Sequence, residues 1–125
     1  MPHDPLDASR MWDMLDAART ARQFVQDKTL ADFLSDRLLR SAVERTLEIV
    51  GEAARHVSEA GRQAHPEIPW NAIIGMRNII AHEYGEVLHA KVWNVCADRL
   101  PALISHLEKA GVESPPPSPD TPDGA

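Results

Sequence analysis

One eight-residue segment, which begins at Arg77, concentrates most of the side chains that could do chemistry. Arg77 supplies a permanent cation, and Asn78 supplies an amide. His82 carries an imidazole, the side chain that most often serves as a general acid or base. Glu83 adds a carboxylate, and Tyr84 is the only tyrosine of the chain. Because a glycine follows, we expect a helix to end there, with the last three of these side chains in its final turn and exit.

This set of residue types suits the cleavage of an RNA phosphodiester. The 2′-hydroxyl of RNA is an internal nucleophile, so the reaction needs a base, an acid and a cation on the phosphorane oxygens rather than a metal. His82 could serve as base or acid, and Arg77 could hold the phosphorane through two hydrogen bonds. Asn78 could orient a phosphate or the imidazole. Since one chain offers one suitable histidine, a two-fold dimer with this segment at its interface would supply two.

The same residues also have a purely structural interpretation. Three glutamates, spaced by four, share one face of an upstream helix: Glu44, Glu48 and Glu52. Arg77 could form an ion pair with one of them or with Glu83. His82 near a helix C-terminus would interact favourably with the helix dipole, and Tyr84 could be a buried ring. An Arg-x4-His spacing alone occurs by chance, so it does not separate the two interpretations.

Length and composition predict one all-α domain. The chain has 125 residues, of which 43% are hydrophobic and only 5% aromatic, a balance that favours helix-on-helix packing over a β-sandwich. The net charge of −6 lacks the basic excess of a general nucleic-acid binder, so any RNA contact would depend on a local cluster. The single cysteine, Cys96, excludes an intramolecular disulfide and a cysteine-based zinc site, and we expect it to be a small buried hydrophobe.

Apolar spacing predicts the helices that must position the segment. A first helix begins at Pro5 and runs to about Val25, and a short helix, 30–35, begins after Thr29 as its N-cap. A long helix then covers 38–57, with a broader apolar stripe than one packing seam needs, and Gly61 with the prolines after it ends that helix.

Two glycine and proline positions shape the rest of the bundle. Gly51 lies inside the long helix and indicates close approach of another backbone, with a dimer contact as one possibility. A further helix begins at Pro69, and the final helix, 87–107, must be kinked or split at Pro101. The sequence therefore predicts a four- to five-helix bundle over residues 1–112, followed by a disordered proline-rich tail at 113–125.

Other functional sites are weakly supported. His82 and His89 are seven residues apart, but no carboxylate spacing completes a metal site, so we predict no metal. The glycines form neither a phosphate-binding loop nor a dinucleotide fingerprint, so we predict no cofactor. Trp70 and Trp93 are interpreted as core or interface anchors rather than base-stacking platforms. No stretch is apolar enough to span a membrane and no signal peptide is recognisable, so we predict a cytoplasmic protein.

The stretch from Trp70 to Tyr84, with its Arg-x4-His-x-Tyr pattern, resembles the HepT family of HEPN-domain toxins. The run 42–53, which contains Gly-Glu-Ala, is similar to the long helix of that family, and Trp93 with the run 100–103 is similar to its final helix. The resemblance covers roughly residues 7 to 110, nearly all of the predicted domain.

The resemblance implies an all-helical, homodimeric, HEPN-like protein that cleaves RNA through Arg77 and His82, with Asn78 and Glu83 in support. It implies a minimal nucleotidyltransferase antitoxin as partner, which silences the toxin by transferring AMP to Tyr84. Such a pair forms a type VII-like toxin–antitoxin system. The alternative is a non-catalytic helical dimer that binds nucleotide, or that binds the nucleotidyltransferase and regulates it.

Overall fold

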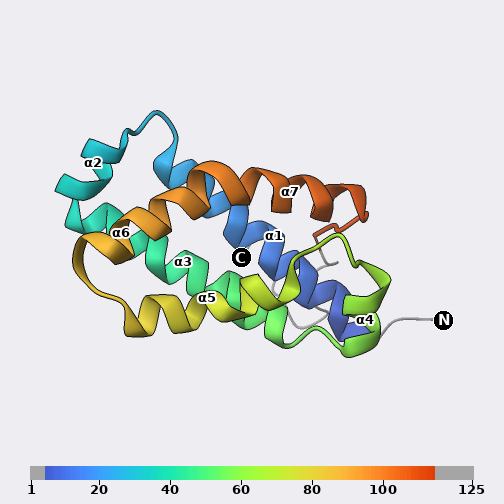
Figure 1. Ribbon diagram of the computed structural model, residues 1–125. Coiled ribbons are helices and arrows are strands. Elements are labelled where there is room, and N and C mark those ends of the chain that lie inside the picture. The colour runs from blue at the N-terminus through green and yellow to red at the C-terminus, as the bar shows by residue number, and fades with distance from the viewer. Residues whose placement is uncertain (1–4, 115–125) are drawn as a thin grey trace, which may run out of the picture.

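The computed structural model describes residues 5–114, and this part of the chain is helical and contains no β-strand. The helices in chain order are α1 (Pro5–Val25), α2 (Leu30–Ser35), α3 (Arg37–Arg55), α4 (Glu59–Ala64), α5 (Trp70–His82), α6 (Gly85–Asn94), the π-helical turn η1 (Val95–Arg99) and α7 (Leu100–Lys109). Because α6, η1 and α7 follow one another as one rod, four long segments form the bundle (Figure 1). The predicted all-α fold is confirmed, whereas the predicted tail at 113–125 lies almost wholly outside the described residues.

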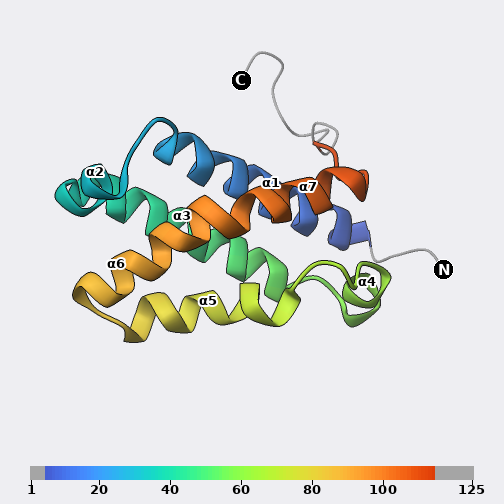
Figure 2. The same ribbon diagram turned by 45° about the horizontal axis from the view of Figure 1, so that its top comes forward.

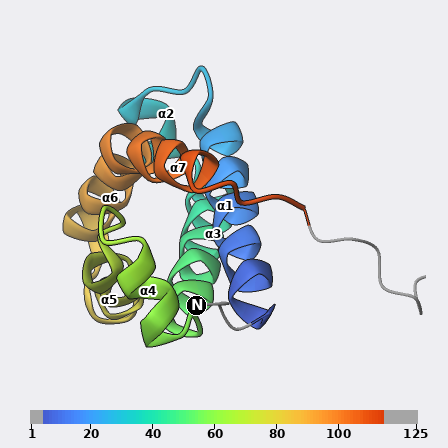
Figure 3. The ribbon, with the colours of Figure 1, turned by 90° about the vertical axis from the view of Figure 1, so that its right-hand side faces the viewer.

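Helix α3 occupies the centre of the bundle. It packs against α1 on one side and α5 on the other, and α7 lies along α1 (Figure 3). The rod of α6 and α7 runs from the end of α5 across α3 to α1 (Figure 2). The buried face of α3 carries Val43, Leu47, Val50 and Ala54 at helical spacing. Neighbours within the same chain therefore account for much of its broad apolar stripe.

Helix α2 begins at the predicted capping box. The Thr29 hydroxyl accepts a hydrogen bond from the Asp32 N–H at 3.1 Å, and the Asp32 carboxylate accepts one from the Thr29 N–H at 2.9 Å. Phe33 is fully buried, and its ring lies 5.5 Å from that of Trp93 in the rod. Trp93 is therefore a packing residue, as predicted.

The long helix ends earlier than predicted. It was expected to continue to Val57 and to stop before Gly61, but α3 ends at Arg55 and the separate helix α4 includes that glycine. The Ser58 hydroxyl caps α4, and the buried carboxylate of Asp7 accepts hydrogen bonds from both the Ser58 N–H, at 2.8 Å, and the Ser58 hydroxyl. A contact from α1, distant in sequence, therefore helps to set this boundary.

The regular α-helical winding of the final helix is interrupted next to Pro101, where a kink or a split was predicted. Pro101 lies in the first turn of α7, where its missing N–H is least costly. The preceding turn is π-helical, and the Leu100 N–H donates to the Val95 carbonyl. The rod therefore continues past the proline with altered winding instead of stopping.

Cys96 and Trp70 fill the core in the way that was expected. Cys96 is fully buried, and this burial raises the pKa of its thiol to about 12, although the nearby Arg22 cation opposes the shift. Trp70 is buried, and its indole N–H donates to the carbonyls of Arg62 and His65 at 3.1 and 3.0 Å. Both interpretations from sequence are confirmed. Across residues 5–114 no helix is long and apolar enough to cross a membrane.

Candidate functional site

The chemically rich segment lies at the end of α5 and in the turn that leads into α6. Helix α5 ends at His82, as the sequence predicts. Tyr84 is extended, with a φ of −135°, and occupies the N-cap position of α6 without a capping hydrogen bond from its side chain. Gly85 then has a φ of +62°, a left-handed conformation that glycine adopts without steric cost. Because the helix has ended, Tyr84 does not share a helix face with Arg77.

The side chains of Asn78, His82 and Tyr84 face solvent. Asn78 and His82 are exposed and lie one turn apart on α5, so they share a face as expected. The His82 imidazole has no hydrogen bond or ion pair with any residue in the described range 5–114. Tyr84 is 80% exposed, so the interpretation as a buried ring is wrong. The Tyr84 side chain therefore projects into solvent.

Arg77 points away from that face and toward α3. Its Nη1 donates to Oε2 of Glu52 at 2.5 Å, which joins α5 to the central helix. The structure therefore selects one member of the glutamate row, and Glu83 is not the partner. His82 follows Arg77 by five positions, which places the two side chains about 140° apart around a regular helix. One chain by itself does not bring the two side chains onto a common helix face.

Glu52 is held by two arginines and one histidine. Its Oε1 accepts hydrogen bonds from Arg55 at 3.1 Å and from Nε2 of His56 at 2.9 Å, while Oε2 accepts from Arg77. The hydrogen bond from Arg55 is the largest reason that the pKa of this carboxyl is lowered, followed by that from His56, and the charge of Arg77 adds to the effect. The site therefore contains a fixed anion beside the candidate catalytic arginine.

Gly51 provides the close approach that brings α3 and α5 together. A Cβ atom at this position would lie 3.0 Å from the Ile73 carbonyl oxygen and 3.4 Å from Cγ of Arg77. The neighbouring backbone that the sequence pointed to is therefore α5 of the same chain. The described contacts of Gly51 do not require a second subunit.

Glu83 bridges the turn between α5 and α6. Its Oε1 forms an ion pair with Nζ of Lys91 on α6, whereas its buried Oε2 has no hydrogen-bond partner among the described residues. The pair ties the start of the turn that carries Tyr84 to the last turn of α6. Glu83 therefore has a structural contact that the sequence did not reveal.

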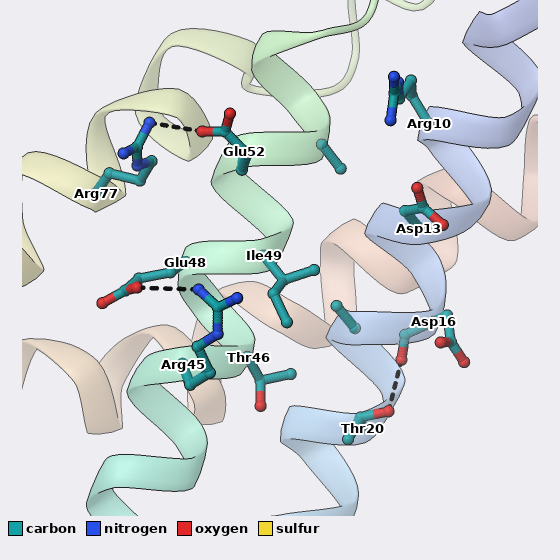
Figure 4. Close-up of a pocket in the computed structure, with 12 residues that line it drawn as sticks. Arg10, Asp13, Asp16, Thr20, Arg45, Thr46, Glu48, Ile49, Glu52 and Arg77 are labelled. Carbon is teal, nitrogen blue, oxygen red and sulfur yellow. Dashed lines mark hydrogen bonds and ion pairs between the residues drawn. The ribbon is translucent and has the colours of Figure 1, made fainter.

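A polar groove of about 390 Å³ extends from Arg77 between α1 and α3 (Figure 4). Its lining carries charges of both signs: Arg10, Asp13, Asp16, Arg45, Glu48, Glu52 and Arg77. Arg45 and Glu48 form an ion pair of 3.5 Å across one side of it. Local sequence patterns do not reveal this groove, because α1 and α3 contribute residues that are far apart in the chain. Over residues 5–114, no group of three or more His, Cys, Asp or Glu side chains is arranged to hold a metal ion.

Comparison with known proteins identifies the family. Residues 14–110 match the family described as ribonuclease HepT-like. The chain belongs to the HepT-like family. It is 33% identical over 97 residues to "Probable ribonuclease HepT" of Thermococcus cleftensis, which covers 78% of this chain and 88% of that protein. It is 31% identical over 98 residues to "Putative RNase MJ1380" of Methanocaldococcus jannaschii, which covers 78% of this chain and 90% of that protein. No solved structure matches the chain.

The match confirms the family that the sequence resembled, and with it the HEPN-like fold class. The matched region contains the whole segment from Arg77 to Tyr84 as well as Gly51 and Glu52. The side chains of interest therefore lie inside the part of the chain that makes it a member of a ribonuclease family.

Proposed function

We propose that this HepT-like protein is a metal-independent endoribonuclease and the toxin of a type VII-like toxin–antitoxin pair. Arg77 and His82 are the catalytic residues, Asn78 and Glu83 support them, and Tyr84 is the residue that receives AMP. The observation that carries the proposal is the exposure of this motif at the end of α5 in a chain of a ribonuclease family.

The chemistry follows from the residue types. A histidine takes the proton of the RNA 2′-hydroxyl, whose oxygen then bonds to phosphorus and forms a cyclic phosphate. The bond from phosphorus to the 5′-oxygen breaks, and a protonated histidine supplies the proton that this leaving oxygen needs. Arg77 stabilises the negative charge that develops on the phosphorane oxygens. Asn78 shares the exposed face of His82, so it can orient the phosphate or the imidazole.

A two-fold homodimer would complete this site. The reaction uses both a base and an acid, but each chain offers one histidine in the motif. Arg77 and His82 of one chain also lie on different sides of α5. If the ends of two α5 helices meet, each phosphate can contact the arginine of one chain and the histidine of the other. This geometric requirement supports the proposed dimer.

Tyr84 is the proposed point of inhibition. Its hydroxyl oxygen would attack the α-phosphorus of a nucleoside triphosphate, pyrophosphate would leave, and the phenolic proton would pass to a base on the transferring enzyme. The ring is 80% exposed on a turn that the Glu83–Lys91 pair helps to fix, so a nucleotidyltransferase can reach it. An attached AMP would place a phosphate and a nucleoside two residues from His82 and obstruct the entry of RNA.

The decisive experiment is RNA cleavage by the purified protein in a buffer that contains a metal chelator. Cleavage should leave cyclic or 3′-phosphate ends, and a single 2′-deoxy nucleotide at the cut site should abolish it. His82→Ala should abolish cleavage without changing the fold. His106→Ala on α7, which lies against α1, is the matched control and should remain active. Equal activity of the two variants would refute the assignment of His82.

The modification has its own test. The partner enzyme and ATP should add AMP to the protein, as measured by intact mass, and should stop its RNA cleavage. Tyr84→Phe should keep full cleavage and gain no mass, because the chain has no other tyrosine. Full cleavage by the modified protein would refute the inhibitory role of the adduct.

The second candidate is a non-catalytic dimer that regulates a nucleotidyltransferase. The engagement of Arg77 by Glu52 in the single chain is the observation that favours it. In that case His82→Ala would leave partner binding intact, and no RNA cleavage would appear under any condition. Expression of this chain alone separates the candidates, because only the ribonuclease should be toxic without its partner.

A further inference from the structure

We infer that Gly51 and Glu52 of α3 form a positioning device that fixes the guanidinium of Arg77 for its role in RNA cleavage. The inference rests on the proposed function and adds two residues to it. Neither residue contacts the reacting atoms in this role. Gly51 determines where the stem of Arg77 lies, and Glu52 determines how its head is oriented.

The stem of Arg77 lies directly over Gly51. A Cβ atom added to Gly51 would lie 3.4 Å from Cγ of Arg77, so any side chain there would press on this stem. The Ile73 carbonyl, one turn before Arg77 on α5, would lie still closer at 3.0 Å. A glycine at this point therefore lets α5 approach α3 closely enough for Arg77 to reach the next residue, Glu52.

Glu52 divides its two oxygens between different tasks. Arg55 and His56, which follow Glu52 by three and four positions, donate hydrogen bonds to Oε1 and hold the carboxylate in place. Oε2 is left for Arg77 on α5. Because Arg55 and His56 already hold the carboxylate in place, Glu52 does not depend on Arg77 for its position. It can therefore restrain the guanidinium of Arg77.

The restraint leaves Arg77 able to bind a phosphate. A guanidinium has five N–H donors, and the Glu52 contact uses Nη1 alone. Nη2 and Nε remain, and they can donate to two oxygens of a phosphate at once. The side chain of Arg77 is half-exposed. An ion pair on one nitrogen thus orients the fork without occupying it.

The test compares Glu52→Gln with Glu48→Gln. Glu48 lies one turn earlier on the same helix, lines the same groove and is also ion-paired with an arginine, so it is a matched control. Glu52→Gln should lower kcat for RNA cleavage by about 10- to 100-fold, the scale of loss when a catalytic group is misplaced by about 1 Å. KM should stay constant or fall, because a carboxylate that repels RNA has been removed. Glu48→Gln should change neither constant.

A nuclear magnetic resonance measurement follows the guanidinium without depending on activity. The Nε–Hε signal of Arg77 can be identified as the one that disappears in Arg77→Lys. Glu52→Gln should shift this signal and increase the motion of Nε, whereas Glu48→Gln should leave it unchanged. Glu52→Asp keeps the charge but shortens the reach by one methylene, so it should be intermediate in both kcat and signal.

The outcomes separate this inference from the proposed function. If the wild-type protein cleaves RNA but the two Gln variants have the same kcat per folded molecule, or the Arg77 signal does not change, the inference is wrong and the proposed function stands. If the wild-type protein cleaves no RNA, the proposed function is wrong, and the signal alone decides whether Glu52 holds Arg77. A lower melting temperature of Glu52→Gln with an unchanged kcat would show a structural role and would also overturn the inference.

Discussion

Replacing Gly51 by alanine probes the closest contact between α3 and α5. The new Cβ would lie 3.0 Å from the Ile73 carbonyl oxygen, so the helices must separate or the side chains must shift. Overpacking of this kind costs about 1–3 kcal/mol. Alanine is also the better helix former by about 1 kcal/mol, which offsets part of the loss. The net effect expected is a loss of up to about 2 kcal/mol in the free energy of unfolding.

Gly75 supplies the matched control for this substitution. It also lies inside a helix, but a Cβ there would meet no atom within 4 Å. Gly75→Ala should therefore stabilise the protein by up to about 1 kcal/mol. Because the helix-propensity gain is common to both variants, their difference of about 1–3 kcal/mol isolates the contact with α5.

Urea unfolding followed by circular dichroism measures this difference. All variants should be compared at one protein concentration, because a dimer makes apparent stability depend on concentration. The midpoint of Gly51→Ala should fall below that of Gly75→Ala, with similar slopes. If the two alanines stabilise the protein equally, the close approach of α3 and α5 at Gly51 is refuted. The proposal that Gly51 determines the position of the Arg77 stem is then refuted as well.

Two further predictions concern buried groups outside the site. Asp7→Ala should lower the free energy of unfolding by about 2–3 kcal/mol in urea unfolding, because it leaves the N–H and hydroxyl of Ser58 without their charged acceptor; an unchanged midpoint would contradict this. Burial raises the pKa of the Cys96 thiol from 9.0 to about 12 in the folded protein. The thiol of the unfolded chain therefore loses its proton at a lower pH, and the free energy of unfolding should fall as pH rises above 9. By pH 10.5 the loss should reach about 2 kcal/mol in urea unfolding, and Cys96→Ala should show a correspondingly weaker pH dependence.

Local signals predicted much of the fold. The capping box at Thr29 and Asp32, the end of α5 at His82 and the interruption near Pro101 all depend on interactions within a few residues, and all three are confirmed. The predicted end of the long helix was wrong, because a carboxylate from the first turn of α1 helps to determine the boundary between α3 and α4. Such a contact leaves no signature in the local spacing of apolar residues.

The candidate site, too, could be predicted from the sequence only in part. Its residue types, their order along α5 and the family to which the chain belongs could be read from residues 77–84 and the helices around them. The sequence offered three glutamates and Glu83 as partners of Arg77 without deciding among them, since helical periodicity defines a face but not the level at which a second helix crosses it. The functional roles of His82 and Tyr84 remain predictions, which the His82→Ala and Tyr84→Phe variants test.

By itself, the sequence determined that this protein is an all-α member of the HepT-like family with an Arg-x4-His-x-Tyr segment at a helix end. These properties follow from local propensity, apolar spacing and residue identity. The tertiary structure alone decided that α5 crosses α3 at Gly51, that Glu52 is the anion beside Arg77, and that His82 faces away from that pair. The physical reason is that helix crossings are set by steric contact between residues far apart in the chain.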